Sequence, residues 1–328
     1  MNERDLHKTV RASLAANYGI EGRLERLPGE NLNFLVIDIR NKKYVIKIVD
    51  EHMPPTVVAM EYAAIEHAVK VGFPLHLPRI IKTKNGKIET GIKIHKNGLH
   101  RSRVIEFLGG TGMSDLSDIS DGLLFDLGKT LARFDQAMEG FDHPAAHRNH
   151  RWNLAQAEQH ESKISLIDEV AKRQLLEWAF GLWRDSKSQL AGLPWQFIHG
   201  DAHDENVLVE DGRVSGLIDF GDCCFNPTVC ELAICLTYLM MRGDDPLHVA
   251  RLITAGYQDL RRLSGAELDM VYPLVCARLA VSVCVANKRK TIDPDNPNWF
   301  GGEGATWRML RRLQDIGPKA VGLALRAV

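Results

Sequence analysis

The sequence has little of several features that would place it in a special class. Aromatic residues make up only 7% of its 328 residues, and the 41 Lys and Arg nearly balance the 42 Asp and Glu. That balance gives no electrostatic reason to expect a nucleic-acid partner or a membrane surface. The longest apolar run, residues 271–286, is shorter than a typical membrane span of about 20 residues and has an arginine at its middle. We therefore expect a buried helix there and a globular, cytoplasmic protein.

The six cysteines lack the paired spacing of a metal site and all lie beyond residue 222 in apolar segments. This distribution predicts reduced, buried thiols. There are no repeats and no low-complexity linker. One local bias is present, because residues 82–103 hold seven Lys or Arg and a single acid. That stretch is either a solvated hairpin edge or a surface that attracts an anion.

The first third of the chain has the pattern of a small sheet. An amphipathic pattern over residues 2–18 predicts a helix, and a second helix is expected over 57–69. Short apolar runs broken by turn residues predict antiparallel strands over 32–39, 42–49 and parts of 79–107. Asn85-Gly86 and Asn97-Gly98 separate the later runs, and Asn-Gly between such runs is a strong hairpin signal.

The remainder of the chain is mainly helical in pattern. Ser120 is placed to cap a helix whose apolar residues recur at spacings of three and four. Further helical patterns cover 153–190, 228–241, 246–263, 266–288 and 305–316. A strand–loop–strand segment, residues 195–220, interrupts them. The expected fold class is α+β and bilobal, with a small antiparallel-sheet lobe over 1–108 and a larger, mainly helical lobe over 109–328.

Polar residues that suit phosphoryl transfer gather in this strand–loop–strand segment. Asp201 and Asn206 have the D-x-x-x-x-N spacing of a kinase catalytic loop, and Asp219 begins an Asp-Phe-Gly sequence after the next strand-like run. A carboxylate can accept the proton of the attacking hydroxyl, and Mg²⁺ takes carboxylate and amide oxygens as ligands. The pattern therefore predicts Asp201 as the catalytic base, and Asn206 and Asp219 as Mg²⁺ ligands.

The first lobe holds candidates for binding the nucleotide. Lys47 has the strand context of the lysine that contacts the α- and β-phosphates, and Glu61 on the following helix is placed to pair with it. The turn expected over the nucleotide spans residues 29–34 and includes Asn33, although it lacks a Gly-x-Gly-x-x-Gly series. We expect the donor to be ATP or GTP.

Residues at the lobe junction and in the second lobe complete the candidate site. Glu106 and Leu108 would present backbone groups to the nucleotide base. The substrate candidates are four charged residues: His203, Asp204, Asp222 and Arg278. Because a buried cation needs a partner, Arg278 would bind either a substrate carboxylate or an internal Asp or Glu. Several aromatic residues would either pack in the core or form a cage for a substrate ammonium group: Trp152, Trp183, Trp195 and Tyr238.

Taken together, these motifs resemble the aminoglycoside phosphotransferase/choline kinase superfamily. The resemblance rests on residues 198–206 and 217–222 and covers nearly the whole chain. Within the superfamily the sequence is most similar to the hydroxylysine kinase group, at residues 31–34, 152–154 and 230–241. The resemblance implies a protein-kinase-like fold and nucleotide-dependent phosphorylation of a hydroxyl group on a small molecule. Where the superfamily often has an aspartate after the Asp-Phe-Gly segment, this chain has Glu231.

The sequence thus predicts a small-molecule kinase, monomeric or homodimeric, with a hydroxylated amino acid or amino alcohol as its acceptor. Alternatives within the enzyme class are an aminoglycoside, choline/ethanolamine or homoserine kinase. An alternative from another class is a catalytically silent nucleotide-binding protein, although none of the five polar groups expected of an active kinase is missing. A nucleic-acid-binding factor would need a basic stripe, and only residues 82–103 offer one.

Overall fold

The computed structural model describes residues 3–27, 32–49, 53–95, 98–294 and 303–327. Contacts divide the chain into two compact units. The first comprises Met1–Glu66 and His76–Gly109, and the second comprises His67–Leu75 and Gly110–Val328. The sequence places residues 67–75 in the first lobe, because it predicts one boundary after residue 108. In the structure this short stretch belongs to the second unit.

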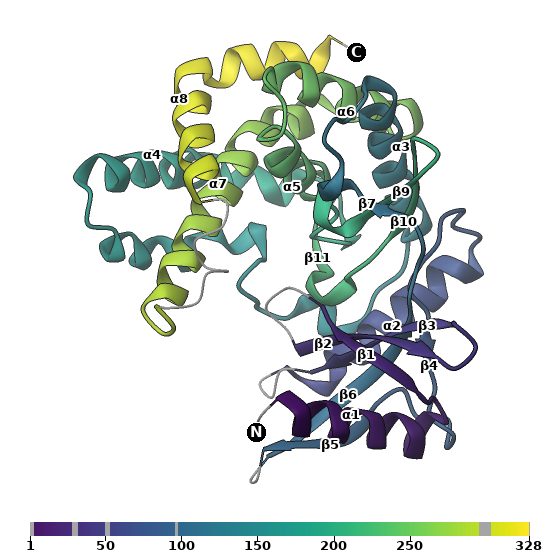
Figure 1. The fold of residues 1–328 in the computed structure, drawn as a ribbon. Coiled ribbons are helices and arrows are strands. Elements are labelled where there is room, and N and C mark those ends of the chain that lie inside the picture. The colour runs from purple at the N-terminus through teal and green to yellow at the C-terminus, as the bar shows by residue number, and fades with distance from the viewer. Residues whose placement is uncertain (1–2, 28–31, 50–52, 96–97, 295–302, 328) are drawn as a thin grey trace. The chain divides into compact units, whose positions relative to one another are not determined.

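A six-stranded antiparallel sheet forms the first unit. Its elements are α1 (Glu3–Tyr18), β1 (Gly22–Arg26), β2 (Leu32–Asp38), β3 (Lys43–Ile48), most of α2 (Pro55–Lys70), β4 (Ile80–Ile81), β5 (Thr90–His95) and β6 (Gly98–Glu106). The strand order is β1-β2-β3-β6-β4, with β5 also paired to β6. Helix α1 lies against this sheet (Figure 1), and its buried residues Leu6, Val10 and Leu14 join Phe34 and Ile46 in one apolar core. The helix predicted over 2–18 is confirmed.

The two predicted Asn-Gly turns have different outcomes. β5 and β6 pair as an antiparallel hairpin, as predicted, although the turn residues 96–97 lie outside the described residues. The hairpin predicted at Asn85-Gly86 is wrong, because β4 and β5 do not pair with each other there. Both pair in succession along one edge of β6. The intervening Thr83–Lys87 turn is closed by the Thr83 N–H, which donates to the Lys87 carbonyl at 2.8 Å.

The second unit carries two small sheets among helices. Its first elements are β7 (Thr111–Gly112), η1 (Met113–Asp115), α3 (Asp121–Ala137), η2 (Pro144–His147), η3 (Leu154–Leu166), α4 (Val170–Ser186), η4 (Lys187–Gly192) and β8 (Trp195–Ile198). Its later elements are η5 (Asp204–Asn206), β9 (Val207–Glu210), β10 (Arg213–Leu217), η6 (Phe220–Asp222), β11 (Cys224–Pro227), α5 (Val229–Leu239), α6 (Pro246–Leu260), α7 (Gly265–Lys290) and α8 (Glu303–Arg326). The single helical pattern predicted over 153–190 is broken where Ile167 adopts extended backbone.

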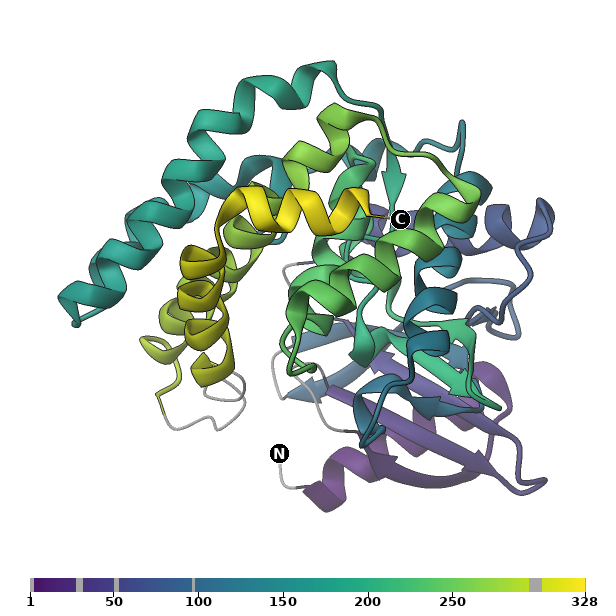
Figure 2. The ribbon, with the colours of Figure 1, turned by 90° about the horizontal axis from the view of Figure 1, so that it is seen from above.

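Helix α7 is the centre of the second unit. It packs against α4, α5, α8 and η3, and Figure 2 shows the yellow α8 running beside it. The backbone of α8 is non-helical at Gly317, where the helix is kinked. Within the described residues, α7 is the one helix long and apolar enough to cross a membrane, and 89% of its apolar window is buried inside the protein. The apolar run is therefore a core helix, as predicted.

Helix α3 fixes both small sheets of this unit. Ser120 caps its first turn by accepting the Leu123 N–H at 3.2 Å, as predicted. The Asp126 carboxylate accepts the Val214 N–H of β10 at 2.9 Å, and the Asp135 carbonyl accepts the Gln196 amide of β8 at 3.1 Å. The sheets β10-β9-β7 and β11-β8, which flank the polar loops, are thus tied to one helix.

Helices α3 and α6 approach each other backbone to backbone at two glycines. A Cβ on Gly128 would lie 1.9 Å from the Ile253 carbonyl oxygen, and one on Gly256 would lie 1.9 Å from the Phe125 carbonyl oxygen. No side chain fits at either distance, so both positions require glycine for packing.

We predict that Gly128→Ala lowers the free energy of unfolding by at least about 2 kcal/mol, because the added methyl group forces the two helices apart. Gly181→Ala is the matched control, since that glycine lies in α4 and its Cβ would meet only the Arg184 side chain at 3.7 Å. It should raise stability by about 0.5–1 kcal/mol through helix propensity. Urea unfolding of both variants measures the difference, and equal effects would contradict the close packing.

Candidate active site

The loop of residues 199–206 connects β8 to β9 and carries the predicted base. Gly200 has φ of 76°, a left-handed conformation that glycine adopts without steric cost. A Cβ there would lie 2.8 Å from the Asp222 carbonyl oxygen. Only glycine therefore allows this loop to lie directly against the segment that follows Asp219.

Glu231, at the start of α5, anchors the loop from beneath. Its side chain is fully buried, and its Oε2 accepts the Gly200 N–H at 3.2 Å. Burial, reinforced by the nearby Asp135 carboxylate, raises the pKa of Glu231 to about 8. The sequence marked Glu231 only as a departure from the superfamily pattern, whereas the structure gives it a role in fixing the loop backbone.

His199 connects the loop to the strand that precedes Asp219. Its ring is fully buried and its Nε2 lies 3.1 Å from the Ile218 carbonyl oxygen. Burial lowers the pKa of His199 to about 4, so the ring is neutral at pH 7 and its Nε2–H donates to that carbonyl. Phe134 and Phe220 meet the ring edge to face, which fixes its orientation.

Both carboxylate oxygens of Asp201 are engaged by neighbouring side chains. Oδ2 accepts the Asn206 amide at 2.8 Å, while Oδ1 accepts Nη2 of Arg278 at 2.8 Å. Nε2 of His203 lies 3.4 Å from the same Oδ1. Burial opposes the charged form, but His203 and Arg278 outweigh it and hold the pKa of Asp201 below its ordinary value. Asp201 is therefore ionised at neutral pH.

His203 lies between two carboxylates. Its Nδ1 is 3.2 Å from Oδ1 of Asp204, and its ring stacks on Tyr238 at 4.0 Å between centroids. Burial alone would lower the pKa of His203, but Asp201 and Asp204 raise it well above its ordinary value. The ring is therefore an imidazolium that bridges the two aspartates.

Arg242 ties this loop to the start of the second unit, and sequence reasoning missed it. Its guanidinium donates to Asp204 Oδ2 at 2.8 Å, and to the carbonyls of Ser114 at 3.0 Å and Leu116 at 2.6 Å. The predicted substrate candidate Asp204 thus has two partners inside the protein, Arg242 and His203. Nothing in the sequence around Arg242, which follows α5, distinguishes it from a surface arginine.

Arg278 has an internal partner in this structure. Its side chain is 1% exposed, and it bonds Asp201, the Tyr238 hydroxyl at 3.2 Å and the Trp152 carbonyl at 3.3 Å. The guanidinium carbon lies 4.6 Å from the Trp152 ring centroid and 5.6 Å from that of Tyr238. Two of the four aromatic residues considered for a substrate cage therefore flank an arginine of the protein itself. Of the other two, Trp183 is buried and Trp195 stacks on Phe225.

The two predicted metal ligands lie on neighbouring backbone segments, because the Ile218 N–H donates to the Asn206 carbonyl at 3.0 Å. The Asn206 amide nitrogen donates to Asp201, which leaves its oxygen, the atom able to ligate a cation, for another partner. Asp219 adopts a left-handed backbone, with φ of 63° and ψ of 76°, which costs a non-glycine residue about 1–3 kcal/mol. Such strain is typical of a side chain held in place for function.

Asp222 adds a third carboxylate to this group. Burial, together with the charges of Asp201 and Asp219, raises the pKa of Asp222 to about 7. Within the described residues no three His, Cys, Asp or Glu side chains form a metal site by themselves. Two protein oxygens beside surplus negative charge nevertheless fit Mg²⁺, which keeps waters and takes phosphate oxygens as its remaining ligands.

His150 was not predicted and lies beside Asp222. Its Nδ1 is 3.8 Å from Asp222 Oδ1. Burial, followed by the charges of Arg148 and Arg278, lowers the pKa of His150 to about 3. The surrounding stretch is irregular, so no periodicity could have marked this histidine as part of the site.

In the first unit, the nucleotide candidates share neighbouring strands. Lys47 on β3 lies opposite Asn33 on β2 and opposite Arg103 on β6. Arg103 Nη2 contacts Oε2 of the buried Glu61 at 2.5 Å. Arg103 is thus an addition to the predicted group, while the pairing of Lys47 with Glu61 stays a prediction.

The remaining predictions for the first unit concern the backbone groups for the nucleotide base, the nucleotide turn and the basic stretch. The Glu106 N–H donates to the Arg79 carbonyl at 2.8 Å, and Leu108 follows the end of β6; their contact with a nucleotide base stays a prediction. Residues 29–31 of the predicted nucleotide turn lie outside the described residues. The basic stretch 82–103 is partly neutralised, because Arg101 pairs with Glu89 at 3.0 Å.

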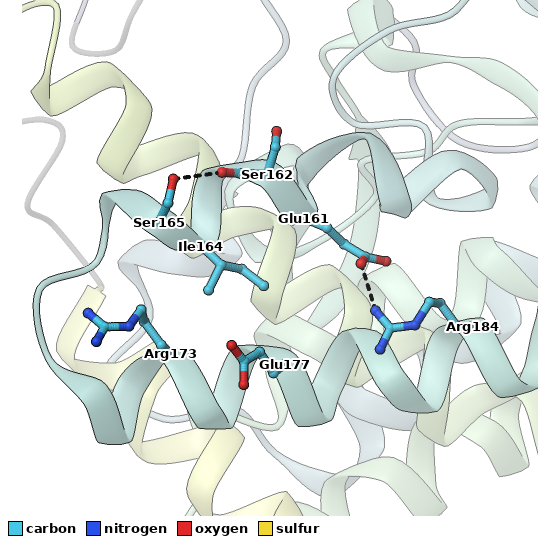
Figure 3. A pocket seen from close by; sticks show the side chains of 7 residues that line it. All are labelled: Glu161, Ser162, Ile164, Ser165, Arg173, Glu177 and Arg184. Carbon is cyan, nitrogen blue, oxygen red and sulfur yellow. Dashed lines mark hydrogen bonds and ion pairs between the residues drawn. The ribbon is translucent and has the colours of Figure 1, made fainter.

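A separate hollow of about 580 Å³ lies between η3 and α4. Figure 3 shows its lining, in which Arg184 and Glu161 form an ion pair of 2.6 Å at one end and Arg173 lies at the other. None of the predicted site residues lines it. The hollow is therefore distinct from the polar loops described above.

Comparison with known proteins identifies the family. Residues 23–266, well over half of the chain, match the phosphotransferase enzyme family, APH. The chain belongs to this family. It is 28% identical to hydroxylysine kinase of Mus musculus, over 91% of this chain and 86% of that protein. It is also 32% identical to homoserine kinase of Gluconobacter oxydans, over 54% of this chain and 56% of that protein.

Solved structures confirm the protein-kinase-like α+β fold that the sequence predicts. An amicoumacin kinase in complex with AMP-PNP, Ca²⁺ and Ami aligns with a TM-score of 0.73 and 16% identity, covering 95% of this chain and 94% of that one. A microcompartment-associated aminopropanol kinase aligns with a TM-score of 0.72 and 17% identity, covering 97% and 99%. The protein is a small-molecule phosphotransferase that acts on a hydroxyl group.

The buried Glu231 predicts a pH-dependent stability. The folded state keeps a proton on Glu231 up to about pH 8, whereas the unfolded chain releases it near 4.5. Between these values the folded state binds the extra proton. Its contribution is complete below pH 4.5 and is lost as pH rises through 8, at about 1.4 kcal/mol per pH unit. Glu231→Gln keeps the acceptor for Gly200 and should remove that slope.

Urea unfolding at pH 5, 6, 7 and 8 measures the slope for wild type and variant. Glu169→Gln is the matched control, because Glu169 is exposed and pairs only on the surface with Lys172. An unchanged slope in Glu231→Gln would show that Glu231 is not protonated in the fold.

Proposed function

We propose that this phosphotransferase moves the γ-phosphoryl group of ATP or GTP to a hydroxylated amino acid or amino alcohol, with Mg²⁺ as cofactor, in the cytoplasm and as a monomer or homodimer. The observation that carries the proposal is the geometry of Asp201, an ionised carboxylate fixed on both oxygens. Such a group is suited to orient an alcohol and accept its proton. The hydroxylysine and homoserine kinases among its relatives support the class of acceptor.

The proposed reaction is an in-line displacement. The acceptor hydroxyl oxygen forms a bond to the γ-phosphorus while the bond from that phosphorus to the bridging oxygen breaks, releasing the nucleoside diphosphate. The hydroxyl proton passes to Asp201 and then to solvent. Catalysis of this kind consists mainly of positioning and charge stabilisation, so the rigidity of Asp201 is its main contribution.

The residues around Asp201 fit a bound Mg²⁺. Asn206 and Asp219 would hold it. The Asn206 amide nitrogen bonds Asp201, so its amide oxygen can bind the ion, and the Asp219 carboxylate is a hard oxygen donor. When bound, Mg²⁺ neutralises charge on the transferring phosphoryl group. Its presence would also relieve the repulsion that raises the pKa of Asp222.

The first unit would bind the nucleotide. Lys47 is placed on a central strand beside Asn33 and Arg103, so its ammonium would contact the phosphates. The buried ion pair of Glu61 with Arg103 would hold α2 to the sheet at this point. Backbone groups of Glu106 and Leu108 would bond the base.

The acceptor alternatives differ in what they require of the site. Choline-type substrates are commonly held in an aromatic cage, but Trp152 and Tyr238 already flank Arg278. This favours an acceptor with primary amines over one with a quaternary ammonium. The homoserine and aminoglycoside alternatives place no such demand and stay second candidates.

We predict that Asp201→Asn lowers turnover by about 10³-fold, because the amide cannot accept the hydroxyl proton. Nucleotide affinity should remain within about twofold. Asp211→Asn is the matched control, since Asp211 occupies the exposed β9–β10 turn at φ of 51°, which Asn tolerates. Coupled ADP and GDP release against hydroxylysine, homoserine, choline, ethanolamine and kanamycin measures turnover.

The same assay separates the competing functions. Full activity in Asp201→Asn would remove Asp201 from the base role. A thermal shift of the wild type with Mg-nucleotide, but no diphosphate release with any acceptor, would favour a silent nucleotide-binding protein.

We also predict that Asp219→Asn and Asn206→Leu raise the Mg²⁺ concentration needed for half-maximal turnover by at least about tenfold, because the first replaces a charged carboxylate ligand by a neutral amide and the second removes the amide oxygen. EDTA should abolish turnover of the wild type, and added Mg²⁺ should restore it. Titration of Mg²⁺ at saturating nucleotide measures the shift. An unchanged Mg²⁺ requirement in both variants would contradict the assignment.

A further inference from the structure

We propose that Arg278 is a positioning residue for Asp201, which commits Asp201 Oδ1 to the protein and leaves Oδ2 to receive the proton of the acceptor hydroxyl. The inference rests on the proposed function, because it needs Asp201 to be the base. It also means that Arg278 binds a carboxylate of the protein, and not the substrate carboxylate that the sequence left as the other possible partner.

The contacts of Arg278 define a fixed orientation. All three guanidinium nitrogens are used: Nε by the Tyr238 hydroxyl, Nη1 by the Trp152 carbonyl and Nη2 by Asp201 Oδ1. The planar group also contacts the rings of Trp152 and Tyr238. Because a guanidinium is planar and presents its donors in a rigid fork, these contacts determine where Nη2 meets the carboxylate.

The elements that carry these residues are rigid. Arg278 lies near the middle of α7, Tyr238 lies in α5, and Trp152 lies two residues before η3 begins at Leu154. Helix α7 packs against both α5 and η3, and the Arg278 side chain is almost completely excluded from solvent. Movement of Nη2 relative to Asp201 would therefore require movement of the core.

The hydrogen-bonding capacity of Asp201 decides which oxygen is available. A carboxylate has about four acceptor positions, two on each oxygen. Oδ1 faces Arg278 at 2.8 Å and His203 at 3.4 Å, whereas Oδ2 faces Asn206 at 2.8 Å. Among the described residues, these three side chains contact the carboxylate, so the acceptor position that remains is on Oδ2. An acceptor hydroxyl would bond there.

The experiment compares Arg278→Met and Arg278→Lys with the wild type in full-length protein. Arg261→Met is the matched control, because Arg261 also forms a largely buried ion pair, with Glu267 at 2.9 Å, but is outside the proposed machinery. We measure kcat, KM for the nucleotide, KM for the acceptor and the unfolding midpoint. Two acceptors are used: hydroxylysine and 1,5-diaminopentan-2-ol, which is the same molecule without its carboxyl group.

The proposal predicts that Arg278→Met lowers kcat by about 100-fold, the effect of misplacing a reacting group by about 1 Å. The loss should be the same for both acceptors, and KM for the nucleotide should stay within about twofold. Arg278→Lys keeps the positive charge but not the forked donor geometry. Its kcat should therefore be about tenfold below that of the wild type, a smaller loss than in Arg278→Met. Arg261→Met should lower the unfolding midpoint and leave kcat within about twofold.

Three results would overturn the proposal. One is a kcat within about threefold of wild type in Arg278→Met. Another is a rise in acceptor KM for hydroxylysine alone, with kcat retained, which would make Arg278 a ligand for the substrate carboxylate. The third is an equal loss of kcat in Arg261→Met, which would indicate general damage to the fold. A wild type inactive with every acceptor would instead overturn the proposed function itself.

Discussion

The candidate active site of the second unit depends on keeping one carboxylate ionised and oriented among buried groups. A buried charge is unfavourable unless it is paired and hydrogen-bonded. Asp201 meets that condition through Arg278, His203 and Asn206, and removing one partner of such a buried pair typically costs about 3–5 kcal/mol. The arrangement is therefore less a source of stability than a means of holding a reactive oxygen in a single place.

Each partner of Asp201 is held by a different part of the unit. Arg278 comes from the core helix α7, and His203 stacks on Tyr238 of α5. The loop backbone is held from below by Glu231, and Arg242 holds Asp204. Because these contacts come from α5, α7 and the loop itself, the site is supported from several directions. This is what positioning requires, since catalysis of phosphoryl transfer needs geometry more than covalent chemistry.

The sequence predicted the elements and the motif far better than the contacts that hold the motif in place. Local spacing was enough to propose Asp201, Asn206 and Asp219 as site residues, because each lies in a short loop beside strand-like runs of the sequence. The partners are non-local: Arg278 is 77 residues from Asp201, and its apolar surroundings indicated a partner without showing whether it is an internal acid or a substrate carboxylate. Arg242 and His150 belong to no recognisable pattern, since a single arginine after a helix or a single histidine in an irregular segment has many ordinary explanations. The hairpin predicted at Asn85-Gly86 was wrong because β4 and β5 pair one after the other with the long strand β6, and not with each other. Local sequence does not reveal such a shared partner.

The most direct measurement is a structure with a non-hydrolysable nucleotide, Mg²⁺ and an acceptor amino alcohol, at a resolution that places the acceptor hydroxyl. The account predicts that hydroxyl oxygen at about 2.6–3.2 Å from Oδ2 of Asp201, with the guanidinium of Arg278 still bonded to Oδ1. A hydroxyl directed at another side chain, or an arginine turned from the aspartate towards the substrate, would contradict it.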